Sequence, residues 1–354
     1  MSVKFSWKKL IPKPDPSKGV PCERSSHGLS LINKAKRLIL FGGERVARTP
    51  ISVDQSTWAA EQGDDGGWSW RQIQTEIHPP PRVAHAQAAY NDSVYIFGGR
   101  AGIQMKEAAM NDLWKLDCSG EPGSESWSLI TPSEDSDPPP EPRSFHKMVC
   151  VGHSLYVFGG CGAAGRLADL SRYDIPTNTW KCLPVSTLRG RGGANFMPFS
   201  SSSMLGVVAG FAGEETKDGQ LFEIAEEKWE PNDLTEALEG LRPRSVCVAA
   251  SFPSVGVSLL YGGEVDPSDR GHEGAGGFES DIVQLDEKTA TYWETTKSGY
   301  PDDENWPEPR GWSDGASSDD GEGNGKLFVY GGLSGDDITP KRLADLWQLD
   351  VQKA

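Results

Sequence analysis

An apolar run that ends in two glycines recurs along this chain, and it constrains the fold more than any other feature. One copy, GVVAGFAG, is degenerate and keeps only Gly210 and Gly213. The other copies keep the doublet, as Gly42–Gly43, Gly98–Gly99, Gly159–Gly160, Gly262–Gly263 and Gly331–Gly332. Paired glycines let strands crowd together and turn where a side chain would clash. Repetition of this unit predicts a repeat architecture rather than two ordinary domains, although the chain has 354 residues.

A second strand and a tryptophan follow the doublets in a fixed order. After a loop comes a strand that usually closes with aspartate, as in DLWKLD at 112–117 and DLWQLD at 345–350. A tryptophan then begins a further strand, and the tryptophans in this position are Trp70, Trp127, Trp180, Trp229 and Trp293. One small sheet cannot bury both of its faces alone, so sheets of this kind stack around an axis and share aromatic cores.

In this order of features the chain resembles the kelch superfamily over essentially its whole length. The resemblance implies an all-β fold, a six-bladed β-propeller in which residues 1–354 form a single domain. The last copy ends at VQKA without a tryptophan strand, whereas FSWKKLI, with Trp7, stands at the other end. We therefore expect the N-terminal strand to complete the last blade and close the ring. Segments 45–66, 132–140 and 315–325 are rich in Gly, Ser, Pro and acidic residues, and we expect loops there.

The charge and the cysteine spacing exclude several classes of function. A formal net charge of −16 argues against a nucleic-acid partner, which would need a basic face. No apolar run is long enough for a signal peptide or a membrane span. The six cysteines form no CxxC pair and suit reduced thiols better than a zinc site. We expect a cytosolic location, with the nucleus as the alternative.

The loops that precede the inner strands each contain one arginine. These arginines are Arg24, Arg82, Arg143, Arg191, Arg244 and Arg310. Two interpretations stay open: they brace neighbouring blades through loop carbonyls, or they form a cationic mouth that recognises sulfate, phosphate or carboxylate. His27, His85 and His146 stand three residues after three of them, and this repetition indicates packing between blades before catalysis.

The segment YGGEVDPSDRGHEGAGGFESD has the highest density of metal-binding residue types. Glu264, Asp266, Asp269 and His272 follow one doublet within nine residues, and carboxylates with an imidazole can form a metal site with open positions. The alternative is an acidic surface loop with a glycine-rich turn. Arg100 stands out separately because it directly follows a doublet, although an arginine there is also consistent with a solvated loop.

Within the kelch superfamily, the chain most resembles the plant specifier proteins of glucosinolate breakdown. The matching motifs are RSSHG, FGGR, RSFHKM, RGGANF, PRSV, GGEV…GH and PRGW. The resemblance implies a pocket with ferrous iron on a Glu-x3-Asp-x3-His segment, which places Glu264 and His272 as ligands. The central position is Ser268, a poor ligand, so Asp266 or Asp269 would have to replace it. By the same resemblance, Arg100 and Arg143 would bind the substrate anion and Trp312 would form an aromatic wall.

These expectations lead to two hypotheses for the function. The first is a pocket on the propeller axis that binds a small anionic ligand and acts, with Fe(II), as a lyase or product-directing protein. The second is a non-enzymatic scaffold that binds a protein partner on its loop face. The sequence assigns no catalytic residue and leaves open whether the chain is an enzyme.

Overall fold

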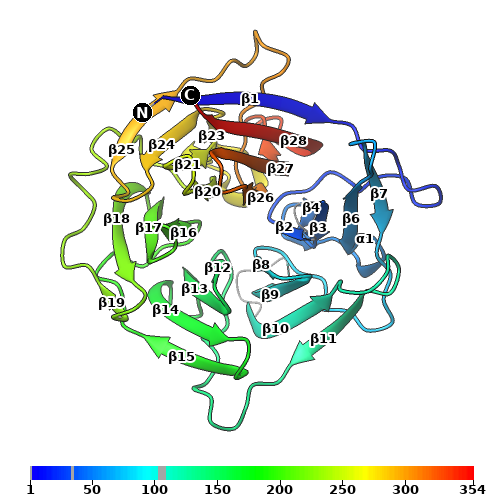
Figure 1. Ribbon diagram of the computed structural model, residues 1–354, viewed down its shortest axis with the longest axis horizontal. Helices are drawn as coiled ribbons and strands as arrows, with labels where there is room; N and C mark the ends of the chain where they lie inside the picture. The colour runs from blue at the N-terminus through cyan, green and yellow to red at the C-terminus, as the bar shows by residue number, and fades with distance from the viewer. Residues whose placement is uncertain (1, 33–35, 103–108) are drawn as a thin grey trace.

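The computed structural model describes residues 2–32, 36–102 and 109–354, except for the side chain of His272. Within these residues, six four-stranded antiparallel sheets stand as blades around one axis (Figure 1). The innermost strands of the six blades lie side by side around that axis. The predicted six-bladed, all-β propeller is therefore confirmed.

The strands of blades 1 to 5 run outward from the axis in chain order, and in blade 6 the first strand of the chain takes the outermost place. Blades 1 and 2 contain β2 (Gly28–Ile32), β3 (Arg37–Phe41), β6 (Thr57–Gln62), β7 (Trp68–Gln72), β8 (Ala86–Tyr90), β9 (Ser93–Arg100), β10 (Ala109–Asp117) and β11 (Ser126–Ile130). Blades 3 and 4 contain β12 (Lys147–Val151), β13 (Ser154–Cys161), β14 (Arg166–Asp174), β15 (Thr179–Leu183), β16 (Asn195–Phe199), β17 (Met204–Phe211), β18 (Glu215–Glu223) and β19 (Lys228–Trp229). Blades 5 and 6 contain β20 (Val248–Phe252), β21 (Val257–Tyr261), β24 (Ile282–Asp286), β25 (Tyr292–Thr296), β26 (Asp314–Asp319), β27 (Asn324–Ser334), β28 (Lys341–Lys353) and β1 (Val3–Leu10).

The ring closes where the two ends of the chain meet. Strand β1 pairs antiparallel with β28 over its whole length, from Val3 opposite Lys353 to Leu10 opposite Leu346 (Figure 1). Trp7, 7% exposed, packs 4.7 Å from the ring of Tyr261 in the neighbouring blade. The N-terminal strand therefore completes blade 6, as the sequence predicts, and it leaves β28 without a free edge.

Apolar side chains fill the space between neighbouring blades. Six clusters of buried apolar residues each combine two adjacent blades. In three of them the phenylalanine before a glycine doublet meets the outer-strand tryptophan of the next blade, as Phe41 meets Trp127 at 5.1 Å between ring centroids. Outer-strand tryptophans thus contact the neighbouring blade as well as their own, where Trp180 meets Tyr173 and Trp229 meets Phe222.

The glycine doublets lie where one blade touches the arginine loop of the next. Gly98 has φ +62°, and a Cβ there would lie 2.9 Å from the carbonyl oxygen of Arg143. In the fourth copy the doublet is Ala209–Gly210, because both residues have positive φ, at 59° and 121°. Gly213, which the sequence suggests as the partner of Gly210, lies beyond the doublet with open space around it.

Two of the expected loops contain regular structure. Segment 45–66 contains most of the hairpin of β4 (Glu44–Val46) with β5 (Thr49–Pro50), the short α1 (Val53–Ser56) and strand β6. Segment 315–325 contains most of β26, the inner strand of the last blade. Composition misled the prediction of loops here. Residues with low strand propensity form strands in these segments because they pair with neighbouring strands.

A closed circle of backbone hydrogen bonds joins all six blades at the axis. The residue two positions after each loop arginine donates its N–H to the equivalent carbonyl of a neighbouring blade, at 2.8–3.3 Å. The six residues all have φ between 49° and 59° and are Ser26, Ala84, Phe145, Gly193, Val246 and Trp312. We call this the axial ring. It fixes how far the six arginine loops stand from the axis.

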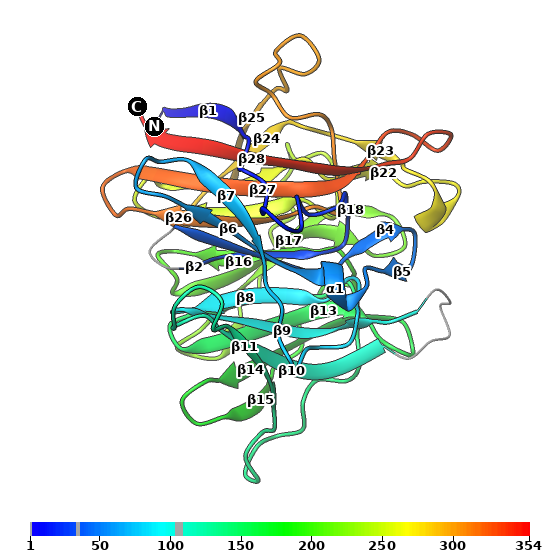
Figure 2. The same cartoon turned by 90° about the vertical axis from the view of Figure 1, so that its right-hand side faces the viewer.

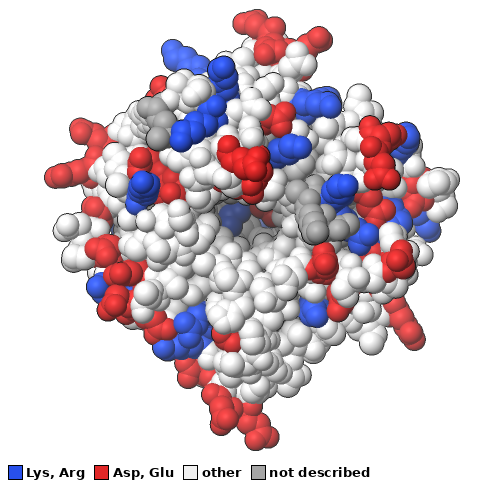
Figure 3. Space-filling view, viewed as in Figure 1, with Lys and Arg blue, Asp and Glu red and all other residues white. Residues whose placement is uncertain are grey.

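The face turned toward the viewer in Figure 1 is hollowed at its centre, with basic and acidic side chains interspersed around it (Figure 3). Two small hairpins, β4–β5 and β22 (Glu264–Asp266) with β23 (Gly277–Phe278), project on the other face (Figure 2). A single 3₁₀ turn, η1 (Gly271–Glu273), lies between β22 and β23. Among the described residues, no helix is long and apolar enough to cross a membrane.

Candidate functional site

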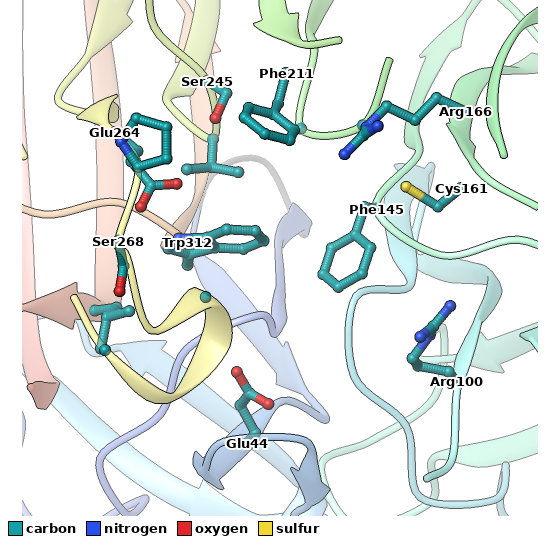
Figure 4. Close-up of a pocket in the computed structure, with 17 residues that line it drawn as sticks. Glu44, Arg100, Phe145, Cys161, Arg166, Phe211, Ser245, Glu264, Ser268 and Trp312 are labelled. Carbon is teal, nitrogen blue, oxygen red and sulfur yellow. The ribbon is translucent and has the colours of Figure 1, made fainter. Parts of the chain in front are cut away.

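A cavity of about 220 Å³ opens over the axial ring, on the face that carries the arginine loops. The residue directly after each glycine doublet lines this cavity, so every blade contributes one side chain (Figure 4). In blade order these residues are Glu44, Arg100, Cys161, Phe211, Glu264 and Leu333. Each forms a β-bridge with the residue that follows the loop arginine. The repeat therefore places six unlike side chains at equivalent positions around one pocket.

The axial ring supplies the apolar floor of the pocket. Phe145 and Trp312 line it and contact each other edge to face, with ring centroids 5.5 Å apart and planes at 78°. Val246 and Gly193 complete the floor. Trp312 was expected as an aromatic wall and does line the cavity, whereas Phe145 was missed because RSFHK resembles the other arginine loops.

Two arginines lie on one side of the pocket, with Cys161 between them (Figure 4). Arg100, 6% exposed, donates from Nε to the Ser144 hydroxyl at 3.1 Å, and its guanidinium lies 5.7 Å from the ring centroid of Phe145. Arg166 begins β14 and its guanidinium stacks 4.6 Å from the centroid of Phe211. Arg100 was expected here and Arg166 was not. Its position in the loop after the third doublet was the available signal.

The six loop arginines do not line this cavity. Each is at most 1% exposed, and all but Arg24 reach an aspartate of their own blade. Arg143, an expected substrate residue, donates to Asp169 at 2.7–2.8 Å and to the Gly159 carbonyl at 3.0 Å. These bonds hold each doublet against its own arginine loop. These contacts agree with the interpretation that the loop arginines brace the blades. The cations that line the pocket are Arg100 and Arg166 instead.

The three repeated histidines lie between blades rather than in the pocket. His85 packs 5.2 Å from the ring of Phe41 in the preceding blade, and neither of its ring nitrogens has a hydrogen-bond partner among the described residues. Burial lowers its pKa to about 3. Burial likewise holds the pKa of His27 and His146 well below the ordinary value. The interpretation as packing residues agrees with these contacts.

Glu264 is the carboxylate of the pocket that the sequence singles out, and it is 8% exposed. Burial, with help from the carboxylates of Asp337 and Asp266, raises its pKa to about 7, against a hydrogen bond from the backbone of Ser268. Behind it, Glu215 accepts from the Ser245 hydroxyl at 3.2 Å. Burial and then the charge of Glu264 raise the pKa of Glu215 to about 8. No motif in the sequence selects Glu215.

The other expected metal ligands do not gather around Glu264. Asp266 and Asp269 are exposed, and the Ser268 hydroxyl donates to Asp337. The side chain of His272 lies outside the described residues. Among the residues that the structure describes, no three His, Cys, Asp or Glu side chains are placed to hold a metal ion. Without the His272 imidazole, the described donors do not by themselves make up the ferrous-iron site that the specifier resemblance implies.

A second cavity of about 130 Å³ lies between the inner strands. Polar groups line it, among them His27, His85 and the pair of Lys147 with Asp314, whose charged atoms are 3.9 Å apart. It has fewer aromatic walls than the first cavity and lacks its paired arginines. The cavity above the axial ring is therefore the stronger candidate for a ligand site.

Comparisons with known proteins agree with this architecture. The model of the KLHDC2/KLHL20/DRC7 Kelch-repeats domain matches residues 3–138 and 68–263. The chain is 26% identical over 337 residues to N-(sulfonatooxy)prop-2-enimidothioate sulfolyase of Thlaspi arvense, covering 88% of this chain and 89% of that one. It is 30% identical over 194 residues to human Host cell factor 2, covering 51% of this chain but 22% of the relative. The solved structure of YjhT superposes with a TM-score of 0.65 at 16% identity, covering 92% of this chain and 95% of that one.

Proposed function

Because the chain belongs to the kelch-repeat family, we propose that the pocket above its axial ring binds a small organic anion and acts on it as a lyase or product-directing protein. The observation that carries this proposal is the pair Arg100 and Arg166 on one side of an aromatic cavity. Two guanidinium groups in one pocket are notable in a chain of net charge −16. They provide a local positive field for a ligand that the rest of the surface would repel.

The two arginines and the aromatic floor have separate tasks in this proposal. Guanidinium forks bind sulfate, phosphate and carboxylate through paired hydrogen bonds. Phe145 and Trp312 would pack against the apolar part of the ligand. Their rings would also limit the access of water to Arg100, which is 6% exposed, and a drier site strengthens the interaction of a guanidinium group with an anion.

A lyase activity would use the same arginines on a departing group. The relative from Thlaspi arvense is named as a sulfolyase, and it matches this chain over 88% of its length. Guanidinium groups that face a developing anion lower the barrier to its departure. We therefore propose Arg100 and Arg166 as the groups that hold the leaving anion.

Calorimetric titration with 4-methylbenzoate and phenyl sulfate tests the binding. We expect binding to the parent, and a loss of about tenfold or more in Arg166→Gln, because a charged hydrogen-bonding partner is removed. The matched control is Arg172→Gln, on the same strand β14, whose guanidinium pairs with Glu227 instead. Equal affinities of the parent and Arg166→Gln would refute the proposed anion site.

Release of sulfate from N-(sulfonatooxy)prop-2-enimidothioate tests the lyase step. Ion chromatography should show faster release with the parent than with Arg166→Gln or with buffer alone. A release rate that the protein does not change would leave an anion-binding protein and remove the lyase from the proposal.

The ferrous ion is not carried into this proposal, because the described donors do not by themselves make up its site. Metal analysis of protein prepared without oxygen tests that choice, with Glu264→Gln and His272→Ala beside the parent. One iron per chain in the parent, lost in both variants, would restore the metal site that the family resemblance implies.

A second candidate function is a scaffold that binds a protein partner on the loop face. The two hairpins β4–β5 and β22–β23 favour it, because they project beside the pocket and present short strand edges (Figure 2). A stoichiometric partner in a pull-down should then survive Arg166→Gln and chelator, and should be lost when a short turn replaces β22–β23. A partner lost in Arg166→Gln would instead bind through the pocket.

A further inference from the structure

The charges that line the pocket are separated across the axis. Arg100 follows the doublet of blade 2 and Glu264 follows the doublet of blade 5, and these two blades are opposite in a ring of six. Arg166, from blade 3, lies on the same side as Arg100. Trp312 and Phe145 occupy the space between the arginines and Glu264 (Figure 4). The lining is therefore positive on one side, aromatic in the middle and negative on the other.

The negative end of this arrangement is not neutralised within the described part of the chain. Among the described residues, no lysine or arginine pairs with Glu264, which is only 8% exposed. At the positive end, Arg166 is exposed and its guanidinium contacts the ring of Phe211. Burying a charge without a partner is costly, so a buried carboxylate such as Glu264 is expected to meet its counter-charge in a ligand.

Glu44, in the same pocket, is a carboxylate whose charge is compensated by neighbouring groups of the protein. It lies in the equivalent position of blade 1, and it accepts hydrogen bonds from the hydroxyls of Ser25 and Ser26 and from the backbone of Arg48. Arg342 lies 3.7 Å from its Oε1. Glu264 has no such cation in the part of the chain that the structure describes, and Ser245 in the pocket wall donates its hydroxyl to Glu215.

We propose that the ligand of this pocket is dipolar: an anionic group meets Arg100 and Arg166, a protonated amine meets Glu264, and an apolar segment lies between them against Trp312 and Phe145. This inference rests on the proposed anion site, and it adds the chemical class of the group at the other end of the ligand. It assigns Glu264 to recognition of a ligand cation. A cavity of about 220 Å³ suits a small molecule of this kind, such as an amino-acid derivative.

Matched aryl probes test the proposal by calorimetric titration of the full chain. The zwitterions are 4-(aminomethyl)benzoate and its homologue with one more methylene, the anion is 4-methylbenzoate, and the cation is 4-methylbenzylamine. We expect at least one zwitterion to bind about tenfold tighter than 4-methylbenzoate, because it adds a charged hydrogen bond at Glu264.

Variants assign the gain to Glu264. Glu264→Gln should abolish the advantage of the zwitterion while 4-methylbenzoate binds as well as before, or better, because a negative charge has gone. Glu236→Gln, an exposed carboxylate outside the pocket, is the matched control and should change neither affinity. Thermal unfolding of each variant confirms that it is folded.

The two proposals fail in different ways. If 4-methylbenzoate binds and neither zwitterion binds more tightly, the dipolar ligand is refuted and the anion site stands. A zwitterion advantage that persists in Glu264→Gln also refutes the assignment. If none of the four probes binds, the anion site fails and the dipolar ligand fails with it.

Discussion

Single residues at repeated positions fall into two groups. Some keep the same residue type in every blade, and others keep only the same place in the blade. The loop arginine occurs in every blade and is buried in every blade, and its fork holds strand and loop together. The residue after the doublet is different in nearly every blade and faces the pocket. Repetition within this chain thus accompanies structural roles, and variation at a repeated position accompanies the candidate site.

The buried arginine–aspartate pairs should differ in strength according to the exposure of the aspartate. Arg244→Met should lower the free energy of unfolding by about 3–5 kcal/mol, because it leaves a buried carboxylate without its partner. Asp281, that partner, is 11% exposed, whereas Asp169, the partner of Arg143, is 31% exposed. Arg143→Met should therefore cost less, because water solvates Asp169. Guanidinium unfolding measures both.

Arg189→Met is the control for these variants, because Arg189 and Glu214 are 60% and 70% exposed and their pair should contribute about 1 kcal/mol or less. If Arg143→Met were fully stable and lost binding of 4-methylbenzoate, Arg143 would be a ligand residue and its bracing role would be refuted.

The buried histidines should make the protein acid-labile. The unfolded chain takes up protons on histidine below about pH 6.5, whereas the folded chain resists them down to about pH 3 at His85. The free energy of unfolding therefore keeps its full value above about pH 6.5. Between about pH 6.5 and pH 3 it falls by about 1.4 kcal/mol per pH unit for each such histidine. Unfolding free energies at pH 7 and pH 5 measure the slope.

His85→Leu should lose less stability than the parent between pH 7 and pH 5, since it removes one proton acceptor of the unfolded chain. His78→Leu changes an exposed histidine outside the blade interfaces and should leave the slope close to that of the parent. Equal slopes in the parent and His85→Leu would contradict the burial argument.

At the scale of elements, contacts between blades matter as much as the strands within one blade. Each doublet lets β3, β9, β13, β17, β21 and β27 pass close to the arginine loop of the next blade, and the N–H of its second glycine donates to that arginine's carbonyl. The same approach sets the positions that line the pocket. A substitution at a doublet should therefore affect stability and the pocket together.

Two glycines with the same backbone conformation separate strain from steric contact. Gly98 and Gly152 have φ of +62° and +60°, but a Cβ at Gly152 would have open space and one at Gly98 would meet backbone and His146 within 3 Å. Gly152→Ala should cost about 1–2 kcal/mol for the left-handed conformation alone. Gly98→Ala should cost about 1–3 kcal/mol more, because blades 2 and 3 must separate. Equal losses in guanidinium unfolding would mean that the close approach is unimportant.

At the scale of the whole molecule, stability depends on a ring that has no free end. The axial ring joins the blades at the centre, the apolar clusters join them at mid-radius, and β1 closes blade 6 at the rim. Blades that contact only their neighbours need such closure, because an open ring would expose the apolar faces of blades 1 and 6.

Trp7 is the side chain through which closure can be tested. Trp7→Ala should lower the free energy of unfolding by about 3–5 kcal/mol, since it removes a buried indole between β1 and blade 5. Lys8→Ala, an exposed neighbour on β1, should change it by about 0.5 kcal/mol or less. Hydrogen exchange should accelerate in β28 of Trp7→Ala. Unchanged exchange there would show that β1 does not hold the ring closed.

The number of blades, the outer-strand tryptophans and the closure by β1 can all be predicted from the sequence, because each depends on features that recur in a fixed order. The sequence also placed Arg100, Glu264 and Trp312 at the pocket. It overlooked β6 and assigned β26 to a loop, since the residues of these strands have no strand signal apart from their pairing.

Which arginines line the pocket depends on the tertiary structure. Arg143 belongs to the repeated arginine loop and Arg166 to the loop after a doublet, but neither pattern says which guanidinium reaches the cavity. Asp169 comes to the guanidinium of Arg143 from a strand 26 residues further along the chain, and so removes it from the pocket. The placement of Glu264 opposite Arg100 likewise follows from six blades closing into a circle, because only closure fixes which side chains face each other across the axis.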